Sequence, residues 1–166
     1  AMGLRLTGQA RASLDRCVLE MHRRGAVRVE DSASLEMQDC QVRRNGGHGV
    51  FVADRATATL SRVTLDDNQG CGVCLQTSRY ASVIDNFLIN NGEDGLFATG
   101  SARVKVELNT CTRNERNGLA FSGEIEGELA ENVCSQNGWS GIQAGDRARL
   151  RAQQNTCRFI TRHGMM

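Results

Sequence analysis

Asn91-Gly92-Glu93-Asp94-Gly95-Leu96-Phe97 contains the phrase from which the whole chain is built: an asparagine, three variable residues, a glycine and an apolar residue. The glycine of this phrase recurs at spacings of 24, 23, 23, 23, 23 and 23 residues, at Gly25, Gly49, Gly72, Gly95, Gly118, Gly141 and Gly164. A period of this length indicates a solenoid or a propeller, in which each repeat is one structural unit.

Each repeat carries three short segments in which apolar and polar residues alternate, and this pattern predicts β-strands. In one repeat, Leu35 and Met37 begin the pattern, Val42 follows, and Val50 and Val52 come directly after the glycine. No segment is long enough for a helix, and a WD-type propeller blade needs about 40 residues. The sequence therefore predicts an all-β fold, a solenoid wound from a single chain as a parallel β-helix, with about seven coils of 23 residues and three short strands per coil.

Residues one repeat apart should stack in columns that face the core. One predicted inward column is Val50, Val73, Leu96, Leu119, Ile142 and Met165, and a second is Met37, Leu60, Val83, Val106, Leu129 and Ala152. Because a coil can bury these side chains only against its neighbours, no single coil should be stable alone.

Asparagines mark the predicted turns. Four residues before the glycine stand Asn45, Asn68, Asn91, Asn114 and Asn137, and nine residues before it stand Asn86, Asn109, Asn132 and Asn155. Asparagine tolerates the left-handed backbone conformation that a sharp corner needs, and its amide can bond to the same amide one coil away. We expect these residues to form the corners and to stack into asparagine ladders.

The repeated Asn-x-x-x-Gly phrase, followed by Val, Leu or Ile, resembles the right-handed parallel β-helix repeats of the pectate-lyase-like superfamily. Similar short coils occur in carbohydrate-binding and sugar-hydrolase domains, in copper-loading periplasmic proteins and in F-box proteins. The resemblance covers nearly the whole chain and implies a right-handed β-helix. It does not assign an activity, because the matching residues are those of turns and core.

Composition indicates one ordinary soluble domain without a strong charge. The chain has 166 residues, of which 40% are apolar and 23% charged, and its net charge is +1. There is no apolar run of about 18 residues, which a membrane span requires. Arg147, Arg149 and Arg151 each stand one repeat after a glutamate, so this basic run predicts ion pairs. We therefore expect neither a nucleic acid nor a membrane as partner.

Ala1-Met2-Gly3 has the composition of a cloning scar, and residues 4–166 are predicted to be a β-helix domain cut from a longer protein. A native leader could have been removed with the preceding residues. The seven cysteines are odd in number and follow the repeat, with Cys111, Cys134 and Cys157 in one inward column. This usage favours a reducing compartment, and hence the cytoplasm, over a disulfide framework.

Asp66, Asp67 and His48 are the candidates for catalysis. Polygalacturonate hydrolases of the superfamily use paired aspartates and a Gly-His-Gly, and the chain contains Asp66-Asp67 and Gly47-His48-Gly49. The order of the two motifs is reversed, however, and the Asn-Thr-Asp and Arg-Ile-Lys partners are missing. The Asp-Pro-His of the epimerases is excluded in a chain without proline. The sequence therefore assigns no catalytic residue.

Cys71-Gly-Val-Cys74 has the spacing of a zinc or redox motif, but a second cysteine pair is missing. We expect Cys71 to lie in a turn and the Cys74 side chain to point outward from a strand. A calcium site would need several stacked carboxylates, whereas the column of Asp67 holds mostly arginine and amide residues. Cys71 and Cys74 are thus the only metal candidates, and no metal or other cofactor is predicted.

An apolar outward face is the strongest functional signal. The position two residues after the glycine, which should face solvent, holds Phe51, Cys74, Phe97, Ala120 and Gln143, and Phe87 and Ile89 form a second apolar spot. Exposed apolar surface of this kind is typical of a binding site or of a contact with another chain. Burial under a loop is the alternative interpretation.

The sequence predicts a rigid interaction or binding module for a protein or polysaccharide ligand, without catalytic activity of its own. The alternative is a polysaccharide-active enzyme, a glycoside hydrolase, lyase or epimerase. The enzyme would need three or more convergent acids and bases on one face, and the columns do not provide them. Self-association is also expected, end to end or through the Phe51 and Phe97 face, unless Phe159 and Ile160 fold over the last coil.

Overall fold

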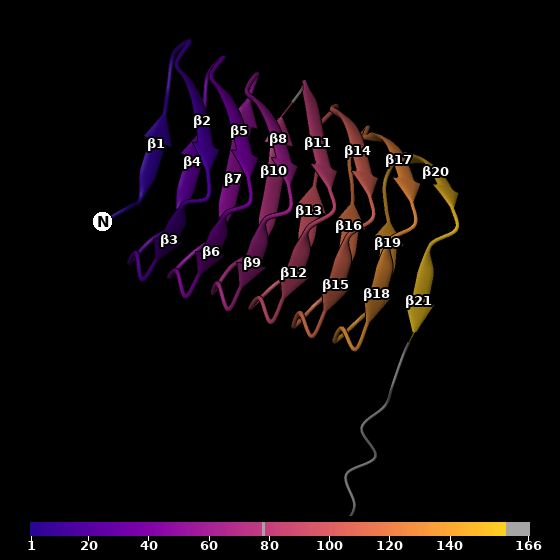
Figure 1. Cartoon of the computed structure of the whole chain (residues 1–166). Coiled ribbons are helices and arrows are strands. Elements are labelled where there is room, and N and C mark those ends of the chain that lie inside the picture. Colours follow the sequence, from indigo (N-terminus) through magenta and orange to yellow (C-terminus); the bar gives the residue numbers. More distant parts are fainter. Residues whose placement is uncertain (78, 159–166) are drawn as a thin grey trace, which may run out of the picture.

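The computed structural model, which describes residues 1–77 and 79–158, is a parallel β-helix in which the chain passes through three sheets in turn (Figure 1). Each sheet has seven strands, and neighbouring strands of a sheet come from successive coils. All pairs between neighbouring strands are parallel. The predicted all-β solenoid is therefore confirmed. The described residues include no helix with the length and apolar character needed to cross a membrane.

We name the three sheets A, B and C in the order in which each coil enters them. Sheet A consists of β1 (Leu4–Leu6), β4 (Val27–Val29), β7 (Val50–Asp54), β10 (Val73–Thr77), β13 (Leu96–Ala98), β16 (Leu119–Phe121) and β19 (Ile142–Ala144). Sheet B consists of β2 (Arg11–Asp15), β5 (Ser34–Gln38), β8 (Thr57–Ser61), β11 (Tyr80–Ile84), β14 (Arg103–Glu107), β17 (Glu126–Ala130) and β20 (Arg149–Gln153). Sheet C consists of β3 (Val18–Glu20), β6 (Gln41–Arg43), β9 (Thr64–Asp66), β12 (Phe87–Ile89), β15 (Thr110–Thr112), β18 (Val133–Ser135) and β21 (Thr156–Arg158).

The core is built from residues one repeat apart, as the columns predict. Val73, for example, pairs with Val50 on one side and with Leu96 on the other. The inward columns are fully buried at Val50, Val73, Leu96, Leu119, Met37, Leu60, Val83, Val106 and Leu129. Ile142 is half-buried and Ala152 is exposed, while Met165 lies outside the described residues.

Both predicted asparagine ladders are present. In the first, at the turn from sheet C to sheet A (the C–A turn), Asn68 donates its Nδ2 proton to Oδ1 of Asn91 over 3.1 Å, and Asn91 donates to Asn114 over 3.0 Å. In the second, between sheets B and C, Asn86 donates to Asn109 over 3.0 Å. Each amide also donates to a main-chain carbonyl, so these buried polar groups are satisfied.

The corner residues differ from the prediction. The left-handed backbone belongs to the residue before each ladder asparagine, at Arg44, Asp67, Asn90, Arg113 and Gln136 for the first ladder. A ladder asparagine must turn its amide inward to meet the next coil. The residue before it makes the corner with its side chain toward solvent, so arginine, aspartate and glutamine are accepted there. The prediction that the ladder asparagines themselves form the left-handed corners is wrong.

The recurrent glycines are required by close backbone contact and not by a left-handed turn. A Cβ atom on Gly72 would lie 2.7 Å from the carbonyl oxygen of Gly95, and one on Gly95 would lie 2.6 Å from that of Gly118. Real Cβ atoms do not approach main-chain oxygens this closely, so any side chain would push successive coils apart. The C–A turns therefore stack tightly, and the residues beside these glycines are held at fixed positions.

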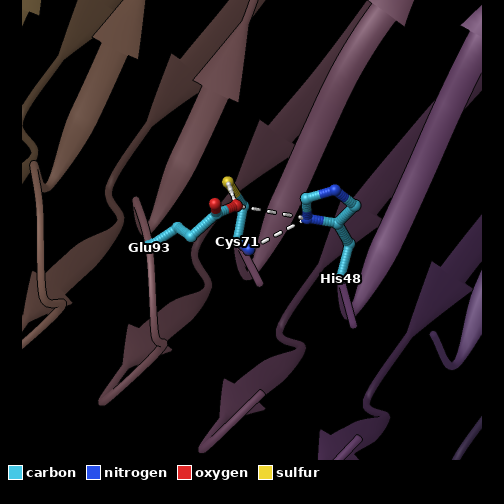
Figure 2. A group of neighbouring side chains, drawn as sticks. All are labelled: His48, Cys71 and Glu93. Carbon is cyan, nitrogen blue, oxygen red and sulfur yellow. Dashed lines mark hydrogen bonds and ion pairs between the residues drawn. The ribbon is translucent and has the colours of Figure 1, made fainter. Parts of the chain in front are cut away.

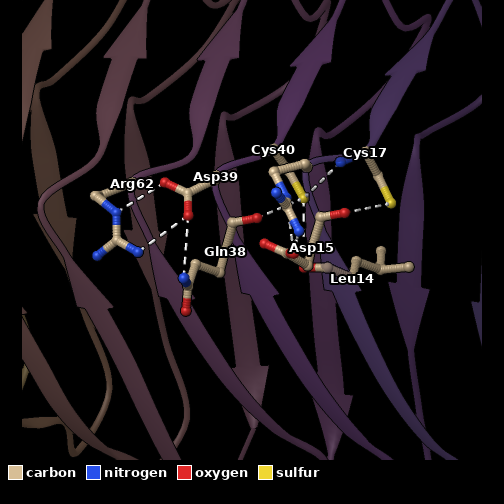
Figure 3. A network of polar contacts seen from close by, with 8 residues as sticks. Leu14, Asp15, Cys17, Gln38, Asp39, Cys40 and Arg62 are labelled. Carbon is tan, nitrogen blue, oxygen red and sulfur yellow. Dashed lines mark hydrogen bonds and ion pairs between the residues drawn. The ribbon is translucent and has the colours of Figure 1, made fainter.

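In the first two coils, cysteines occupy the position that asparagine fills in the second ladder (Figure 3). The N–H of Cys17 donates to Sγ of Cys40 over 3.4 Å, and the single proton of the Cys40 thiol faces the carbonyl oxygens of Gln38 at 3.1 Å and Leu14 at 3.4 Å. Burial raises the pKa of the Cys40 thiol above its ordinary value. This thiol thus supports the backbone as the asparagine amides do elsewhere. All seven cysteines are free thiols, and Cys157 is the exposed member of the group.

Candidate functional site

A column of side chains with varied chemistry lies in the C–A turn, at the position before each recurrent glycine. Its members are His48, Cys71, Asp94, Asn117 and Ser140. The N–H of Cys71 donates to Nδ1 of His48 over 2.9 Å, and the N–H of Asn117 donates to Oδ1 of Asp94 over 2.9 Å. The N–H of Ser140 donates to Oδ1 of Asn117 over 3.2 Å. The side chains of His48, Asp94 and Asn117 thus support the backbone of the following coil.

Glu93, one residue before this column, brings a carboxylate to His48 and Cys71 (Figure 2). Its Oε2 lies 3.5 Å from Sγ of Cys71 and 3.9 Å from Nδ1 of His48. One donor atom from each of the three residues lies within 4.8 Å of the other two. Cys71 is buried, whereas the side chains of His48 and Glu93 are 32% and 31% exposed. The His48–Cys71–Glu93 cluster is therefore accessible from solvent on one side.

The Cys71 thiol is protonated in this setting. Contact with the Cys74 thiol and burial raise its pKa far above the ordinary value, and His48 only partly offsets them. Contact with the Cys71 thiol, helped by the Glu93 carboxylate, raises the pKa of His48, while burial acts against this rise. Above that pKa the ring is neutral, and Nδ1 can then accept the N–H of Cys71 with the proton on Nε2.

Nucleophilic catalysis does not fit this geometry. A Cys–His–acid arrangement places the imidazole between the thiol and the carboxylate. Here both the Cys71 thiol and Nδ1 of His48 face the same oxygen of Glu93, and the raised thiol pKa disfavours the reactive thiolate. Sulfur, nitrogen and oxygen donors that converge on one point are instead the ligand set of a borderline or soft metal ion.

Aromatic and arginine side chains extend the cluster in both directions. Phe51 stacks on the His48 ring with 5.8 Å between centroids, and the Arg28 guanidinium lies 4.6 Å from the Phe51 centroid. On the other side, Arg116 lies 3.5 Å from Oε1 of Glu93 and 5.5 Å from the ring centroid of Trp139. Charge–ring contacts of this kind are attractive. A continuous row of side chains thus runs from Arg28 to Trp139, which is 62% exposed.

A basic hollow opens beside Phe51. Its volume is ≈ 560 Å³, and its charged or aromatic lining comprises Arg5, Arg23, Arg24, Arg28, His48 and Phe51. We call it the Phe51 hollow. Arg5 and Arg28 both pair with Glu30, at 2.9 and 2.6 Å, and this contact raises the pKa of Arg28. Arg23 and Arg24 are exposed, and no ion pair to either is found within the described residues. Their charges are available to an anionic ligand.

Comparison with known protein families settles the architecture. Residues 25–164 match the family described as "Right handed beta helix region". The chain belongs to this right-handed β-helix family. No curated protein and no solved structure matches the chain. The match confirms the expected resemblance to right-handed β-helix repeat proteins, and it leaves the ligand of this β-helix open, because the fold hosts many functions.

The three catalytic candidates have different surroundings in the β-helix. Asp66 accepts a hydrogen bond from Nδ2 of Asn90 over 2.9 Å. Asp67 occupies a left-handed corner with a φ of 55°, the position that Arg44 and Asn90 fill in the neighbouring coils. The polar contacts of His48 are with Cys71 and Glu93. No contact joins His48 to either aspartate among the described residues.

Cys71 and Cys74, the two metal candidates, lie close together, but they do not form a solvent-exposed pair of cysteines. Cys74 is on the outward side of β10, yet it is only 1% exposed, because Phe51 and Phe97 flank it on the neighbouring strands. Its thiol contacts that of Cys71. Cys71 lies in the C–A turn, as the sequence predicts. Cys74 points outward as predicted, but it is not exposed as an outward apolar column was expected to be, because the large rings beside it cover the small side chain.

The predicted binding face is less uniform than a single apolar column. Phe51 and Phe97 are half-buried, Ala120 is buried and Gln143 is exposed. In the second spot, Phe87 is exposed and Ile89 is half-buried. Whether these surfaces bind a ligand or another copy of the chain stays a prediction. Phe159 and Ile160, the residues expected to cover the last coil, lie outside the described residues.

Glu93, Arg116 and Trp139 were not among the residues predicted from sequence. The 23-residue period groups residues at equivalent coil positions. Glu93 stands one residue before the position that His48 and Cys71 occupy in their coils. A side chain as long as glutamate reaches across that offset. A comparison that also included positions shifted by one residue would have placed Glu93 beside Cys71.

The basic run on sheet B forms ion pairs in a modified pattern. Arg147 contacts Glu124 at 3.1 Å, as the 23-residue offset predicts. Glu126, however, contacts Arg103 of the preceding coil at 3.0 Å and not Arg149 of the following one. Exposed pairs of this kind contribute about 0–1 kcal/mol each, so they shape the surface more than they stabilise the fold.

Proposed function

We propose that this β-helix domain is a binding module without catalytic activity, and that its ligand is a carbohydrate carrying carboxylate or sulfate groups. The observation that carries the proposal is the Phe51 hollow, whose lining holds four arginine side chains and one phenylalanine ring. Arginine binds carboxylate and sulfate oxygens with two parallel N–H donors. Phe51 contacts Arg28 and His48 through its ring, and the part of the ring that stays exposed offers apolar surface to a sugar while the charged groups of the sugar meet the arginines.

The size and charge of the hollow support this ligand class. A volume of ≈ 560 Å³ lies in the range of small-ligand sites, and it suits a short saccharide more than an extended protein surface. Arg23 and Arg24 carry charge that Glu30 does not neutralise. A neutral sugar would leave these charges without partners, so we expect selectivity for acidic residues.

The lining of the hollow argues against hydrolysis. Glycoside hydrolases use two carboxyl groups on either side of the bond to be cleaved, about 5–9.5 Å apart. Among the described residues, the lining of the Phe51 hollow contains no aspartate or glutamate. His48 is the one imidazole in the described lining, and it already contacts Cys71 and Glu93. The polysaccharide-active enzyme stays the alternative, to be decided by product formation.

Calorimetric titration with an oligogalacturonate and with its methyl-esterified, uncharged counterpart tests the proposal. We expect binding of the acidic oligomer alone, weakened by added salt. Arg24→Ala should weaken it about tenfold, the effect of one charge-assisted hydrogen bond, and Phe51→Ala by a similar factor. Arg151→Ala, which removes an exposed arginine from sheet B, is the matched control and should bind normally.

Three outcomes would reject the proposal. Equal binding of the acidic and neutral oligomers would remove the role of the arginines. Full affinity in Arg24→Ala and Phe51→Ala would place the site elsewhere, and release of shorter products would establish the enzyme alternative. Light scattering of the same samples tests the predicted self-association through Phe51 and Phe97, because a dimer made in this way should be weakened by Phe51→Ala without any saccharide present.

A further inference from the structure

We propose that the His48–Cys71–Glu93 cluster binds one zinc ion, with the fourth position held by water. The donors are an imidazole nitrogen, a thiolate and a carboxylate oxygen, contributed by three successive coils at the C–A turn (Figure 2). This site is separate from the proposed saccharide site, although His48 borders both. Neither proposal depends on the other.

The distances between donor atoms are close to those that zinc requires. A tetrahedral ion with bonds of about 2.0–2.3 Å holds its ligand atoms about 3.3–3.6 Å apart. Oε2 of Glu93 is 3.5 Å from Sγ of Cys71 and 3.9 Å from Nδ1 of His48, and no distance in the set exceeds 4.8 Å. Small side-chain rotations are therefore sufficient to close the site, and the backbone can stay in place.

The surrounding structure holds the ligands in position. A Cβ atom on Gly70 would lie 2.6 Å from Nδ1 of His48, so the absence of a side chain there leaves room for the imidazole. Phe51 stacks on the same imidazole. Arg116 contacts Oε1 of Glu93 and leaves Oε2 free to face the cluster. Groups that orient metal ligands in this way commonly strengthen metal binding.

The donor chemistry favours zinc over calcium or magnesium. Calcium and magnesium prefer oxygen ligands, whereas sulfur with imidazole nitrogen suits zinc and its transition-metal neighbours. Thiolate and carboxylate together carry two negative charges, which a divalent cation neutralises. His48 and Glu93 are partly exposed and allow the ion to enter. An open side with three protein ligands also leaves room for a bound water.

Metal binding has to replace one existing interaction. In the structure, Nδ1 of His48 accepts the N–H of Cys71, and a nitrogen lone pair cannot serve this bond and a metal ion together. When Nδ1 binds the ion, the N–H of Cys71 exchanges this acceptor for water, and the imidazole keeps its proton on Nε2. The thiol gives up its proton to solvent when the metal binds.

Cobalt(II) and zinc are the probes for this site. Metal-free protein in a phosphine reductant is titrated with Co²⁺, which gives thiolate charge-transfer absorption only when sulfur is bound to it. We expect about one equivalent of cobalt to produce that absorption, and Zn²⁺ to abolish it by displacement. Cys71→Ser should remove the absorption, and Glu93→Gln should weaken binding at least tenfold. Cys157→Ser removes an exposed thiol and is the control that should retain the site.

Unchanged absorption in Cys71→Ser would assign the metal to another cysteine and overturn the proposal. Equal affinity of Glu93→Gln and the unmodified protein would do the same. Because Glu93 is partly exposed, this variant should fold even if a change at the buried Cys71 does not, and circular dichroism checks both. A protein that shows no thiolate absorption at a stoichiometric cobalt concentration does not contain the site.

Discussion

Two pairs of residues occupy the same coil position at the C–A turn but differ in their chemistry. One pair is His48 with Cys71, and the other is Asp94 with Asn117. In both pairs the first side chain accepts the backbone N–H of the second residue over 2.9 Å. Asp94 also accepts the side-chain amide of Asn117 over 2.8 Å, and both of these residues are buried. In the other pair the imidazole and thiol meet a third residue, Glu93, on a side open to solvent.

The difference shows how a repeat can separate structure from chemistry. The backbone needs only an acceptor at this position, and imidazole, carboxylate and amide all provide one. The identity of that acceptor has a chemical consequence. Asp94 and Asn117 form a closed hydrogen-bond network, whereas His48 and Cys71 leave side-chain atoms available as metal ligands. Five substitutions test this interpretation, in order of decreasing effect.

Leu96→Ala should have the largest effect, because Leu96 lies in the core between Val73 and Leu119 and has 0% exposure. Emptying such a site costs about 2–5 kcal/mol of unfolding free energy. A urea unfolding curve measures it, with Phe87→Ala on the exposed surface as control. A loss below about 0.5 kcal/mol would show that this column does not carry the fold.

Asn117→Ala should be next, at about 1–3 kcal/mol. The substitution leaves the buried Asp94 carboxylate without its amide donor and the N–H of Ser140 without its acceptor. The measurement is again chemical unfolding, and Gln143→Ala, exposed on sheet A, is the control. If Asn117→Ala were as mild as the control, the closed half of the column would have no special structural role.

His48→Ala should cost less than Asn117→Ala, about 1 kcal/mol. It removes the acceptor of the Cys71 N–H and the stacking on Phe51, but water can reach a side chain that is 32% exposed and replace the hydrogen bond. A cost equal to that of Asn117→Ala in the same unfolding assay would contradict the contrast between the two halves.

Asp66→Asn and Asp67→Asn should have the smallest effects, within about 0.5 kcal/mol in stability and a few-fold in ligand binding. Asp66 makes an exposed contact with Asn90, and asparagine tolerates the left-handed conformation of Asp67. Binding is followed with the acidic oligosaccharide used above. If the unmodified protein cleaves a uronate polymer and either change abolishes cleavage, these aspartates are catalytic and the binding-module proposal fails.

The repeat period made the fold predictable, whereas the residues that form the left-handed corners could be identified only in the structure. The spacing of Gly49, Gly72 and Gly95 gives the coil length directly, and apolar residues at that spacing can be buried only by stacking. Asn91 and its equivalents were correctly expected to form ladders, since identical amides one coil apart can bond to each other. Their backbone conformation was not predicted, because the sequence does not show which of two adjacent polar residues turns inward.

The candidate site was only half visible in the sequence. His48 and Cys71 stand out as reactive residue types at one coil position, and Cys74 completes a recognisable spacing. Glu93 belongs to a different column, and it reaches the pair because its side chain spans the offset of one residue. The Phe51 hollow likewise collects arginines from separate coils and from both the strand and the turn.

By itself, the sequence determined the period, the number of strands per coil, the inward columns and the ladders of this β-helix. These follow from local alternation and from a fixed repeat, so no long-range information is needed. Only the tertiary structure decided that Cys74 is covered, that Glu93 meets His48 and Cys71, and that four arginines line one hollow with Phe51. The physical reason is that such contacts depend on the direction and length of side chains from neighbouring coils, which a repeat pattern does not specify.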